Sequence, residues 1–290
     1  MDLASIGAIT FDFGNTLIPV DRAGLRRVVE VTARAVGERL GPFPPEDFLS
    51  IWADERERQF REEVPQFREV DLADRFVRVL ARLRGMSAPE ADERWDQAAA
   101  ATRSEPAEID WAVGAYSDAF VEGMPVDPAI ERVLATLARD ATLAILSNWP
   151  LAVTVDRYAE AAGWLPYLRA IVISQRVGTI KPHPAIFEEA RRLIGDPEPD
   201  TILHVGDDWA ADVVGAVRAG WRAGYVTDRP HDSPLPASQR DESVAADLEI
   251  GSVGELPALR DAALRIGRDR AFAPLGERLG RWEDAPPETG

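Results

Sequence analysis

The sequence predicts an α/β protein with a Rossmann-like, doubly wound, mainly parallel sheet core and an inserted all-helical cap domain. After residue 125, short apolar runs alternate with segments of helical periodicity, which is typical of right-handed βαβ units in a parallel sheet. From about residue 20 to residue 124, the apolar spacing is helical throughout. One earlier apolar run, at residues 6–13, must join the later strands because a single strand is not stable alone.

The elements follow one another in a regular order. The inserted block is expected to form helices at residues 22–40, 46–62, 71–84, 89–102 and 109–121. The later strands are expected at residues 142–146, 170–173, 201–205, 223–226 and 246–250. The helices of the second half are expected at residues 127–139, 150–163, 184–194, 209–219 and 252–264.

This order divides the chain into three parts. Residues 1–18 and 125–264 are expected to form the α/β core, and residues 19–124 the helical insertion. Residues 265–290 form a polar C-terminal extension, whose last nine residues have the composition of a disordered tail. Residues 229–243 are rich in Pro, Ser and Asp and predict a surface loop.

Composition limits the kinds of site and partner. The chain contains no cysteine, which excludes disulfides, thiolate catalysis and cysteine metal sites. Because the N-terminal segment has the pattern of a strand and not of a signal peptide, we expect a cytoplasmic protein. No apolar run approaches the roughly 18 residues of a membrane helix. The formal net charge of −17 repels nucleic acid and anionic membranes, although it serves solubility equally well.

The lysine content is unusual. Of the 33 basic residues, 32 are arginine and only Lys181 is lysine. Lysine carries a compact point charge whereas arginine carries a planar fork, so a position that keeps lysine against this bias indicates a need for an ammonium group. The alternative is chance, because a single lysine must fall somewhere.

Polar residues follow each predicted strand, at the sheet edge where α/β proteins bind ligands. Those candidates are Asp12, Gly14, Asn15 and Thr16 after the first strand, Ser147 and Asn148 after the second, Lys181 after the third, and Asp207, Asp208 and Asp212 after the fourth. Three carboxylates within six residues repel one another unless a cation lies among them, and oxygen ligands at this density favour magnesium. Each residue also has a simpler explanation: a turn for Asp12, a helix cap for Asp208 or Asn148, and a solvated loop for Lys181.

Taken in order, four motifs over about residues 5–264 resemble the haloacid dehalogenase-like (HAD) superfamily. The segment from Asp12 to Thr16 resembles the family's D-x-D-x-T motif, and Ser147 resembles its Ser/Thr motif. The segment GTIKPHPAIF around Lys181 resembles the lysine motif. The segment from Asp207 to Asp212 resembles the G-D-x-x-x-x-D motif.

The resemblance implies an activity and a set of roles. It implies that Asp12 attacks phosphorus and forms an aspartyl-phosphate, with a small phosphorylated molecule as substrate. It implies Mg²⁺ held by Asp12, the carbonyl of Gly14, Asp207 and, directly or through water, Asp212. Phosphate oxygens are then bound by Thr16, Ser147 and Lys181, with Asn15 and Asn148 beside the substrate. The helical insertion corresponds to the family's cap, which closes over the site and selects the substrate. The sequence does not distinguish a monomer from a homodimer.

One position departs from the family pattern. The second aspartate of the first motif, which protonates the leaving group and later activates water, is replaced by Gly14. General acid–base help of this kind contributes about 10²–10⁴-fold, or roughly 3–5 kcal/mol. We favour a phosphohydrolase that is slow, or needs a good leaving group, or takes an acid such as His183 from elsewhere. The alternatives are a dehalogenase-type hydrolase acting at carbon, against which the acidic fourth motif argues, and a catalytically silent binding or regulatory protein.

Overall fold

A computed structural model describes the backbone of residues 2–272 and the side chains of residues 2–265. Its centre is a six-stranded parallel sheet in the order β3-β2-β1-β4-β5-β6. The strands are β1 Ala8–Phe11, β2 Thr142–Ser147, β3 Leu168–Ile173, β4 Ile202–Gly206, β5 Arg222–Val226 and β6 Leu248–Ile250. Every strand expected from the sequence is present, and the doubly wound α/β fold is confirmed.

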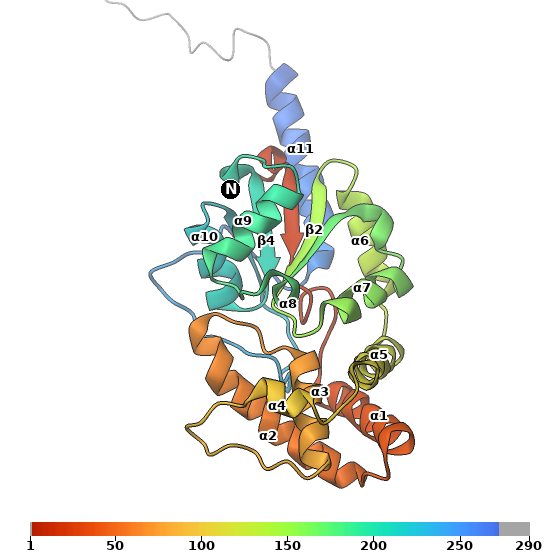
Figure 1. The fold of residues 1–290 in the computed structure, drawn as a ribbon. Helices are drawn as coiled ribbons and strands as arrows, with labels where there is room; N and C mark the ends of the chain where they lie inside the picture. Colours follow the sequence, from red (N-terminus) through yellow and green to blue (C-terminus); the bar gives the residue numbers. More distant parts are fainter. Residues whose placement is uncertain (1, 273–290) are drawn as a thin grey trace, which may run out of the picture.

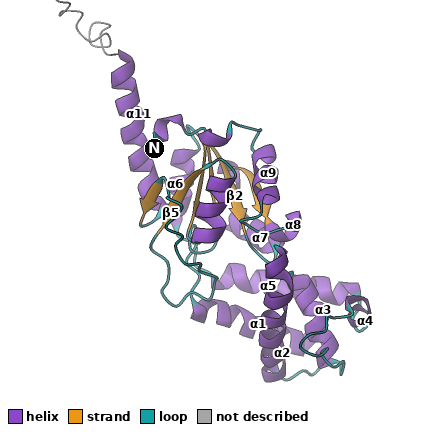
Figure 2. Ribbon diagram, turned by 90° about the vertical axis from the view of Figure 1, so that its left-hand side faces the viewer, coloured by secondary structure: helices purple, strands orange, loops and turns teal. Residues whose placement is uncertain are grey.

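Helices cover both faces of the sheet (Figures 1 and 2). They are α6 Pro128–Leu137, α7 Ala152–Ala161, α8 Ser174–Val177, α9 Pro184–Leu193, α10 Gly215–Arg218 and α11 Leu256–Phe272. Ile9 and Phe11 of β1 pack in one core cluster with α6, α7 and α11, whereas Ala8 packs in a second cluster with α9 and α10. This alternation follows from the two-residue period of a strand, which turns successive side chains to opposite faces.

Short helical turns complete the core and the inserted helices. They are the 3₁₀ helices η1 Leu3–Ser5, η2 Val64–Gln66, η3 Leu165–Tyr167, η4 Pro199–Thr201 and η6 Val253–Glu255, and the π-helix η5 Trp209–Val214. The helix expected at residues 209–219 is therefore two segments, η5 and α10. The final helix, expected at residues 252–264, is observed at Leu256–Phe272, and its proline, Pro257, lies in the first turn, where it breaks no ladder hydrogen bond. Residues 273–290, which include the predicted disordered tail, lie outside the described residues.

Between β1 and β2 the chain forms a block of helices, which we call the helical layer (residues 22–123). It contains α1 Arg22–Leu40, α2 Pro45–Glu63, α3 Leu72–Leu83, α4 Gln97–Ala101 and α5 Pro106–Gly123. Figure 1 shows the helical layer beyond the carboxyl ends of the strands. From β1 the chain builds β2 and β3 toward one edge of the sheet, and it then crosses back to place β4 on the other side of β1. The strand order therefore switches between β1 and β4, and parallel α/β sheets open a crevice for ligands at such a point.

One expected helix in this layer is mostly absent. Residues 89–102 were expected to be helical, but only Gln97–Ala101 are, starting after the cap residue Asp96. The preceding turn is held by Arg58, whose guanidinium donates to the carbonyls of Pro89, Glu90 and Glu93. Because a side chain satisfies these carbonyls, the segment does not need a helical ladder.

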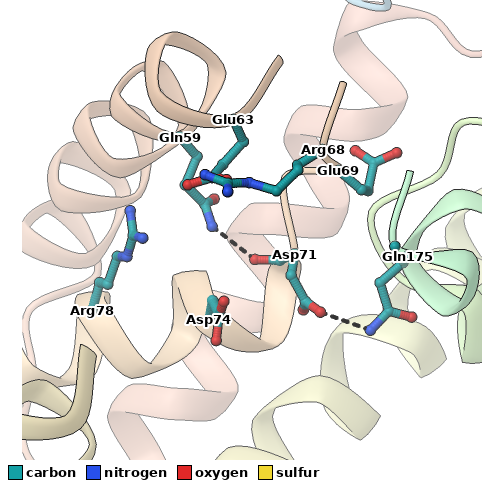
Figure 3. Close-up of a pocket in the computed structure, with 9 residues that line it drawn as sticks. Gln59, Glu63, Arg68, Glu69, Asp71, Asp74, Arg78 and Gln175 are labelled. Carbon is teal, nitrogen blue, oxygen red and sulfur yellow. Dashed lines mark hydrogen bonds and ion pairs between the residues drawn. The ribbon is translucent and has the colours of Figure 1, made fainter. Parts of the chain in front are cut away.

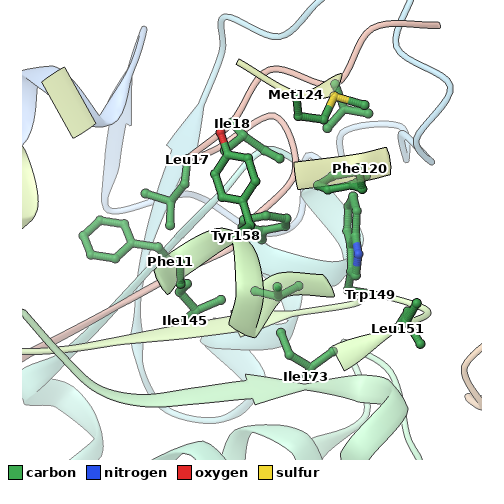
Figure 4. Packing of buried hydrophobic residues seen from close by; sticks show 14 of the residues in the cluster. Phe11, Leu17, Ile18, Phe120, Met124, Ile145, Trp149, Leu151, Tyr158 and Ile173 are labelled. Atoms are coloured by element: carbon green, nitrogen blue, oxygen red, sulfur yellow. The ribbon is translucent and has the colours of Figure 1, made fainter. Parts of the chain in front are cut away.

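Large aromatic side chains pack beneath the loop that follows β1. Phe13 lies edge-on to Trp149, Tyr158 and Trp164, with ring centroids 5.1, 5.5 and 6.4 Å apart. Phe120 of α5 lies edge-on to Trp149 at 5.4 Å (Figure 4). Edge-to-face pairs add about 0.5–1.5 kcal/mol each beyond area burial. This packing fixes the backbone on which Asp12 and Gly14 sit and joins it to the helical layer.

Candidate active site

The single lysine of the chain lies at the centre of the sheet edge. Lys181 Nζ donates to Asp12 Oδ1 at 2.8 Å, to Asp212 Oδ1 at 2.6 Å and to the carbonyl of Leu146 at 2.8 Å. The residue is 2% exposed. Burial lowers the pKa of Lys181, but the two carboxylates outweigh burial and raise it above its usual value. The ammonium is therefore permanently charged and ties the loop after β1 to the segment after β4.

Three carboxylates gather at the same place. One oxygen each of Asp12, Asp207 and Asp212 lies within 4.8 Å of the others. Burial, followed by repulsion from Asp12 and Asp212, raises the pKa of Asp207 to about 8. Burial raises the pKa of Asp12 to about 6, although Lys181 opposes the shift. Lys181 does not neutralise the cluster alone, and a buried set of hard oxygen donors that repel one another fits a divalent cation.

The segment after β4 is shaped to bring Asp212 back to the sheet edge. A Cβ on Gly206 would lie 2.2 Å from Asp212 Cγ, so only glycine permits this approach. Asp212 Oδ2 accepts from the backbone N–H of Asp208, 2.8 Å away. Asp208 itself caps η5 by accepting from Ala211 N and also binds Ser238, which supports its expected role as a helix cap.

A buried histidine lies behind the lysine and the aspartate. His204 Nε2 is 3.1 Å from Asp212 Oδ1 and 3.4 Å from Lys181 Nζ, and its Nδ1 is 2.8 Å from Thr10 Oγ1. Burial and the nearby lysine lower the pKa of His204. The pKa of Asp212, which burial alone would raise, is held well below its usual value by Lys181 and His204. Sequence analysis did not identify His204 as a site residue, because a histidine within a strand usually belongs to the core.

The turn after Asp12 is held by Asn15. Asn15 adopts a left-handed backbone with φ of 57°, a conformation that asparagine tolerates well. Its side chain accepts from Val20 N and donates to Asp207 Oδ2 at 3.3 Å and Ser233 Oγ at 3.0 Å. Asn15 therefore braces the turn against the acidic cluster.

Two buried hydroxyls lie at this edge, Thr16 Oγ1 and Ser147 Oγ, both shielded from solvent within the described part of the chain. Thr16 Oγ1 has no hydrogen-bond partner there, and an unsatisfied buried hydroxyl costs about 1–3 kcal/mol. Ser147 lies close enough to Asp12 for its hydroxyl to lower the pKa of that carboxyl. Thr16 follows β1, as Asp12 does, and Ser147 ends the neighbouring strand β2, so both hydroxyls are available as donors to an anion bound beside Asp12.

Asn148 has its polar groups engaged by the protein. Its Nδ2 donates to the carbonyl of Lys181 at 3.0 Å, and its Oδ1 accepts from Lys181 N at 2.7 Å. The side chain therefore holds the lysine loop in position. A direct contact with substrate, expected from the sequence, stays a prediction.

The position of the missing aspartate is occupied by another part of the chain. A Cβ on Gly14 would lie 2.5 Å from Leu235 Cδ1 and 3.0 Å from Trp149 Cζ3. Arg229 from the same loop pairs with Asp207 Oδ2 at 2.9 Å. Residues 229–243 were expected to be only a surface loop, but this part of the chain reaches into the site. Leu235 and Arg229 were not identified from the sequence, because a single leucine and a single arginine within a Pro- and Ser-rich segment form no recognisable motif.

A cavity of about 480 Å³ opens above these groups, between the sheet edge and the helical layer. Its core side includes Asp12, Gly14, Asn148, Lys181, Asp207 and Asp212. Four aromatic residues of the helical layer line the other side of the cavity: Trp52, Phe60, Phe67 and Tyr116. Trp95 does not line it, because its indole donates to the buried Glu55. His183 caps α9 by accepting from Ala185 N and does not line the cavity, so the structure gives no support for its use as a substitute acid.

A second, smaller cavity of about 290 Å³ is polar (Figure 3). Its groups satisfy one another: Asp71 accepts from Gln59 and Gln175, and Glu63 pairs with Arg68. With these donors and acceptors engaged, it has no set of free groups comparable to the first cavity.

A family model for haloacid dehalogenase-like hydrolases matches residues 6–220. The chain belongs to this family. This HAD-like hydrolase is 28% identical over 151 residues to pyrimidine 5'-nucleotidase YjjG of Escherichia coli K12, covering 50% of the chain and 63% of YjjG. It is 23% identical over 262 residues to human N-acylneuraminate-9-phosphatase, covering 89% and 95%. It is 43% identical over 90 residues to glyceraldehyde 3-phosphate phosphatase of Methanopyrus kandleri, covering 31% and 37%. The chain thus spans less than two-thirds of YjjG and of the M. kandleri enzyme.

Solved structures share the fold of this HAD-like hydrolase. A 2-haloacid dehalogenase from Pseudomonas syringae has a TM-score of 0.58 at 23% identity, covering 89% of this chain and 99% of its own. The HAD-hydrolase YfnB from Bacillus subtilis, bound to magnesium, has a TM-score of 0.53 at 18% identity, covering 88% and 99%. At these identities the likeness establishes the fold alone. Within residues 2–272, no helix combines the length and apolar character needed to cross a membrane.

Proposed function

We propose that this HAD-like hydrolase is a magnesium-dependent phosphohydrolase that acts on a small phosphorylated molecule through an aspartyl-phosphate on Asp12. The observation that carries the proposal is the environment of the Asp12 carboxylate. It lies at a strand end, beside a buried ammonium, within a three-carboxylate cluster and on the wall of the cavity. Within this proposal the helical layer acts as a cap. Cytoplasmic localisation and a monomeric or homodimeric state stay predictions.

The oxygen donors suit Mg²⁺. Asp12, the carbonyl of Gly14, Asp207 and Asp212 would hold it, and three of these contribute the carboxylates that cluster within 4.8 Å. When bound, the ion would neutralise negative charge on the carboxylates and on the phosphoryl group. Burial, with repulsion from Asp12 and Asp212, raises the pKa of Asp207 to about 8 even though Arg229 opposes the shift, and a bound cation would relieve this repulsion.

The chain's own groups divide the remaining work. Lys181 binds Asp12 Oδ1, which leaves Oδ2 to attack phosphorus. Thr16 and Ser147 supply hydroxyl donors to phosphoryl oxygens, the binding roles expected from the sequence, which stay predictions. As the new O–P bond forms, the bond from phosphorus to the leaving oxygen breaks, and that oxygen departs with the electron pair.

Gly14 decides how this departure proceeds. Glycine has no proton to give the leaving oxygen and no base to activate water against the aspartyl-phosphate. A substrate whose leaving group is stable as an anion is therefore turned over best, and the second step is slow. An activated aryl phosphate is expected to release its phenol in a burst that is followed by slow turnover.

The absence of an acid also suits displacement at carbon, where a halide leaves without a proton. The 2-haloacid dehalogenase from Pseudomonas syringae shares the fold. The acidic cluster separates this candidate from the phosphohydrolase, because displacement of halide requires no cation to screen a phosphoryl group. A catalytically silent binding protein is the third candidate.

One experiment distinguishes the three. Release of 4-nitrophenol from 4-nitrophenyl phosphate, and of chloride from 2-chloropropionate, is measured with Mg²⁺ and with EDTA. Asp12→Asn serves as the inactive variant. Asp118→Asn is the control, because Asp118 is an exposed residue of α5 that pairs with Arg157 and does not line the cavity. We expect Mg²⁺-dependent phenol release that Asp12→Asn abolishes. Metal-independent chloride release would show a dehalogenase, and no release of either product would show a silent protein.

A further inference from the structure

We propose that the helical-layer end of the 480 Å³ cavity binds a second anionic group of the substrate. The substrate is then a phosphate ester with a flat, apolar body and a carboxylate at the end remote from phosphorus. This inference rests on the proposed function, because it places the phosphoryl group at Asp12. It adds the chemical class of the substrate.

Arg75 of α3 is the main observation. Its side chain is buried and lines the cavity. Its Nε donates to Gln59 Oε1 at 2.8 Å, and its guanidinium lies 5.1 Å from the centre of the Trp52 ring. Among the described residues, no carboxylate forms an ion pair with Arg75 and no acceptor binds its two terminal nitrogens. Burial lowers the pKa of Arg75 to about 10, so the group is still charged at neutral pH.

Glu69 is the acidic residue that would compete with an anionic ligand for Arg75. It also lines the cavity, and its charge acts on Arg75. However, its carboxylate is bound to Ser174 Oγ and to the backbone N–H of Val70. Burial raises the pKa of Glu69, against the opposing effect of the Ser174 hydrogen bond. The Arg75 guanidinium is therefore left with unused donors that face the cavity.

Arg56 of α2 repeats the pattern. It lines the same cavity and lies 4.9 Å from the centre of the Phe60 ring. Within the described part of the chain, its guanidinium donates only to the carbonyl of Pro234, at 3.3 Å. By contrast, neighbouring arginines of the helical layer pair with acids: Arg78 with Glu62, and Arg82 with Glu55. In a chain of net charge −17, two cavity arginines without a carboxylate partner mark a local preference for an anion.

The walls between the two ends are aromatic and apolar. Trp52 stacks on Tyr116 with ring centroids 5.8 Å apart, and both line the cavity with Phe60 and Trp149. The Tyr116 hydroxyl, whose pKa burial raises to about 12, stays protonated and available as a donor. Flat aromatic walls favour a flat apolar body, and the guanidinium fork of arginine suits a carboxylate.

The test uses two phosphonates that cannot be hydrolysed and that differ only in the carboxylate. They are 4-(phosphonomethyl)benzoate and benzylphosphonate, and their dissociation constants are measured by titration calorimetry in the presence of Mg²⁺. A charge-assisted contact to carboxylate predicts that the wild type binds the first compound about 10- to 100-fold more tightly. Arg75→Met should remove this preference and leave the affinity for benzylphosphonate unchanged.

Matched variants control for folding. Arg75→Lys keeps the charge and should keep part of the preference for the phosphonate that carries the carboxylate. Arg56→Met should reduce the same preference, and it tests the inference even if Arg75→Met does not fold. Arg26→Met is the control, because Arg26 is an exposed arginine of the same layer that pairs with Glu30 and does not line the cavity.

The outcomes separate the two proposals. Equal affinity of the wild type for both phosphonates would overturn the inference, and Mg²⁺-dependent hydrolysis of 4-nitrophenyl phosphate would then still support the proposed function. A preference that survives both Arg75→Met and Arg56→Met would also overturn it. If benzylphosphonate does not bind and no phosphate ester is hydrolysed, the proposed function fails and the inference fails with it.

Discussion

Restoring an aspartate at position 14 tests whether acid–base help is the only missing part of the site. Gly14→Asp supplies a carboxyl beside Asp12, where general acid–base help is worth about 10²–10⁴-fold in rate. The substitution meets an obstacle, because the new Cβ would lie 2.5 Å from Leu235 Cδ1 and 3.0 Å from Trp149 Cζ3. We therefore expect the single variant to gain little, and Gly14→Asp combined with Leu235→Ala to gain much more.

The size of the difference follows from the clash. Displacing a packed side chain costs about 1–3 kcal/mol. In rate this equals about one to two powers of ten when the displacement is needed to place the carboxyl. Leu235→Ala removes the Cδ1 atom that makes the closest contact, whereas Trp149 at 3.0 Å has only to shift slightly. The double variant should then approach the full effect of a general acid, about 10²-fold or more.

The assay compares two leaving groups. 4-Nitrophenolate departs without a proton, whereas the more basic phenolate of phenyl phosphate needs one. The double variant should therefore accelerate phenyl phosphate hydrolysis far more than the burst from 4-nitrophenyl phosphate. Leu235→Ala alone, and Gly14→Asn with Leu235→Ala, control for space and for side-chain size. Equal acceleration of both substrates, or none in a double variant with native thermal stability, would refute the reasoning.

Three further predictions concern stability. Thr16→Val removes an unpartnered buried hydroxyl, so thermal unfolding should show a gain of about 1 kcal/mol while KM for a phosphate ester rises about tenfold; a stability loss would contradict this. Gly206→Ala should cost about 1–3 kcal/mol, because its Cβ would lie 2.2 Å from Asp212 Cγ, whereas Gly114→Ala, with nothing within 4 Å, should be neutral or stabilising. The pKa of Asp207 is about 8 in the folded chain against an ordinary 3.8, so the folded state binds a proton more tightly. This stabilising contribution is complete below pH 4 and is lost as pH rises through 8. Melting curves in EDTA should show the loss, and Mg²⁺ should raise Tm more at pH 8 than at pH 5; an equal effect would count against the carboxylate cluster as its site.

The sequence predicted the convergence of the main site residues because topology determines it. Once residues 142–146 and 201–205 are assigned as parallel strands on either side of the first, their following residues must meet at one edge. Asp12, Lys181 and Asp212 accordingly lie within hydrogen-bond distance, although they come from three separate segments. The bias toward arginine added a second, independent indication for Lys181.

Other contacts depend on side chains that no local pattern reveals. The engagement of Asn148 with the Lys181 backbone, and the packing of Leu235 on Gly14, join segments that are remote in sequence. A periodicity argument identifies which face of a helix is apolar, but it does not separate a core aromatic from one that lines a cavity. Trp52 and Trp95 illustrate this, because both are buried and only Trp52 lines the cavity.

The energetic cost of the site argues that anion binding and turnover are separate properties of this protein. The acid–base position is lost, and Leu235 fills the space at Gly14, so that loss leaves no cavity behind. The hydroxyl groups that are expected to bind an anion are, by contrast, retained. Thr16 keeps an unpartnered buried hydroxyl, which costs about 1–3 kcal/mol where valine would fold more stably, and Ser147 keeps a hydroxyl beside Asp12. Under the proposed function, these retained donors serve to bind the phosphoryl group, whatever the rate at which the aspartyl-phosphate is released.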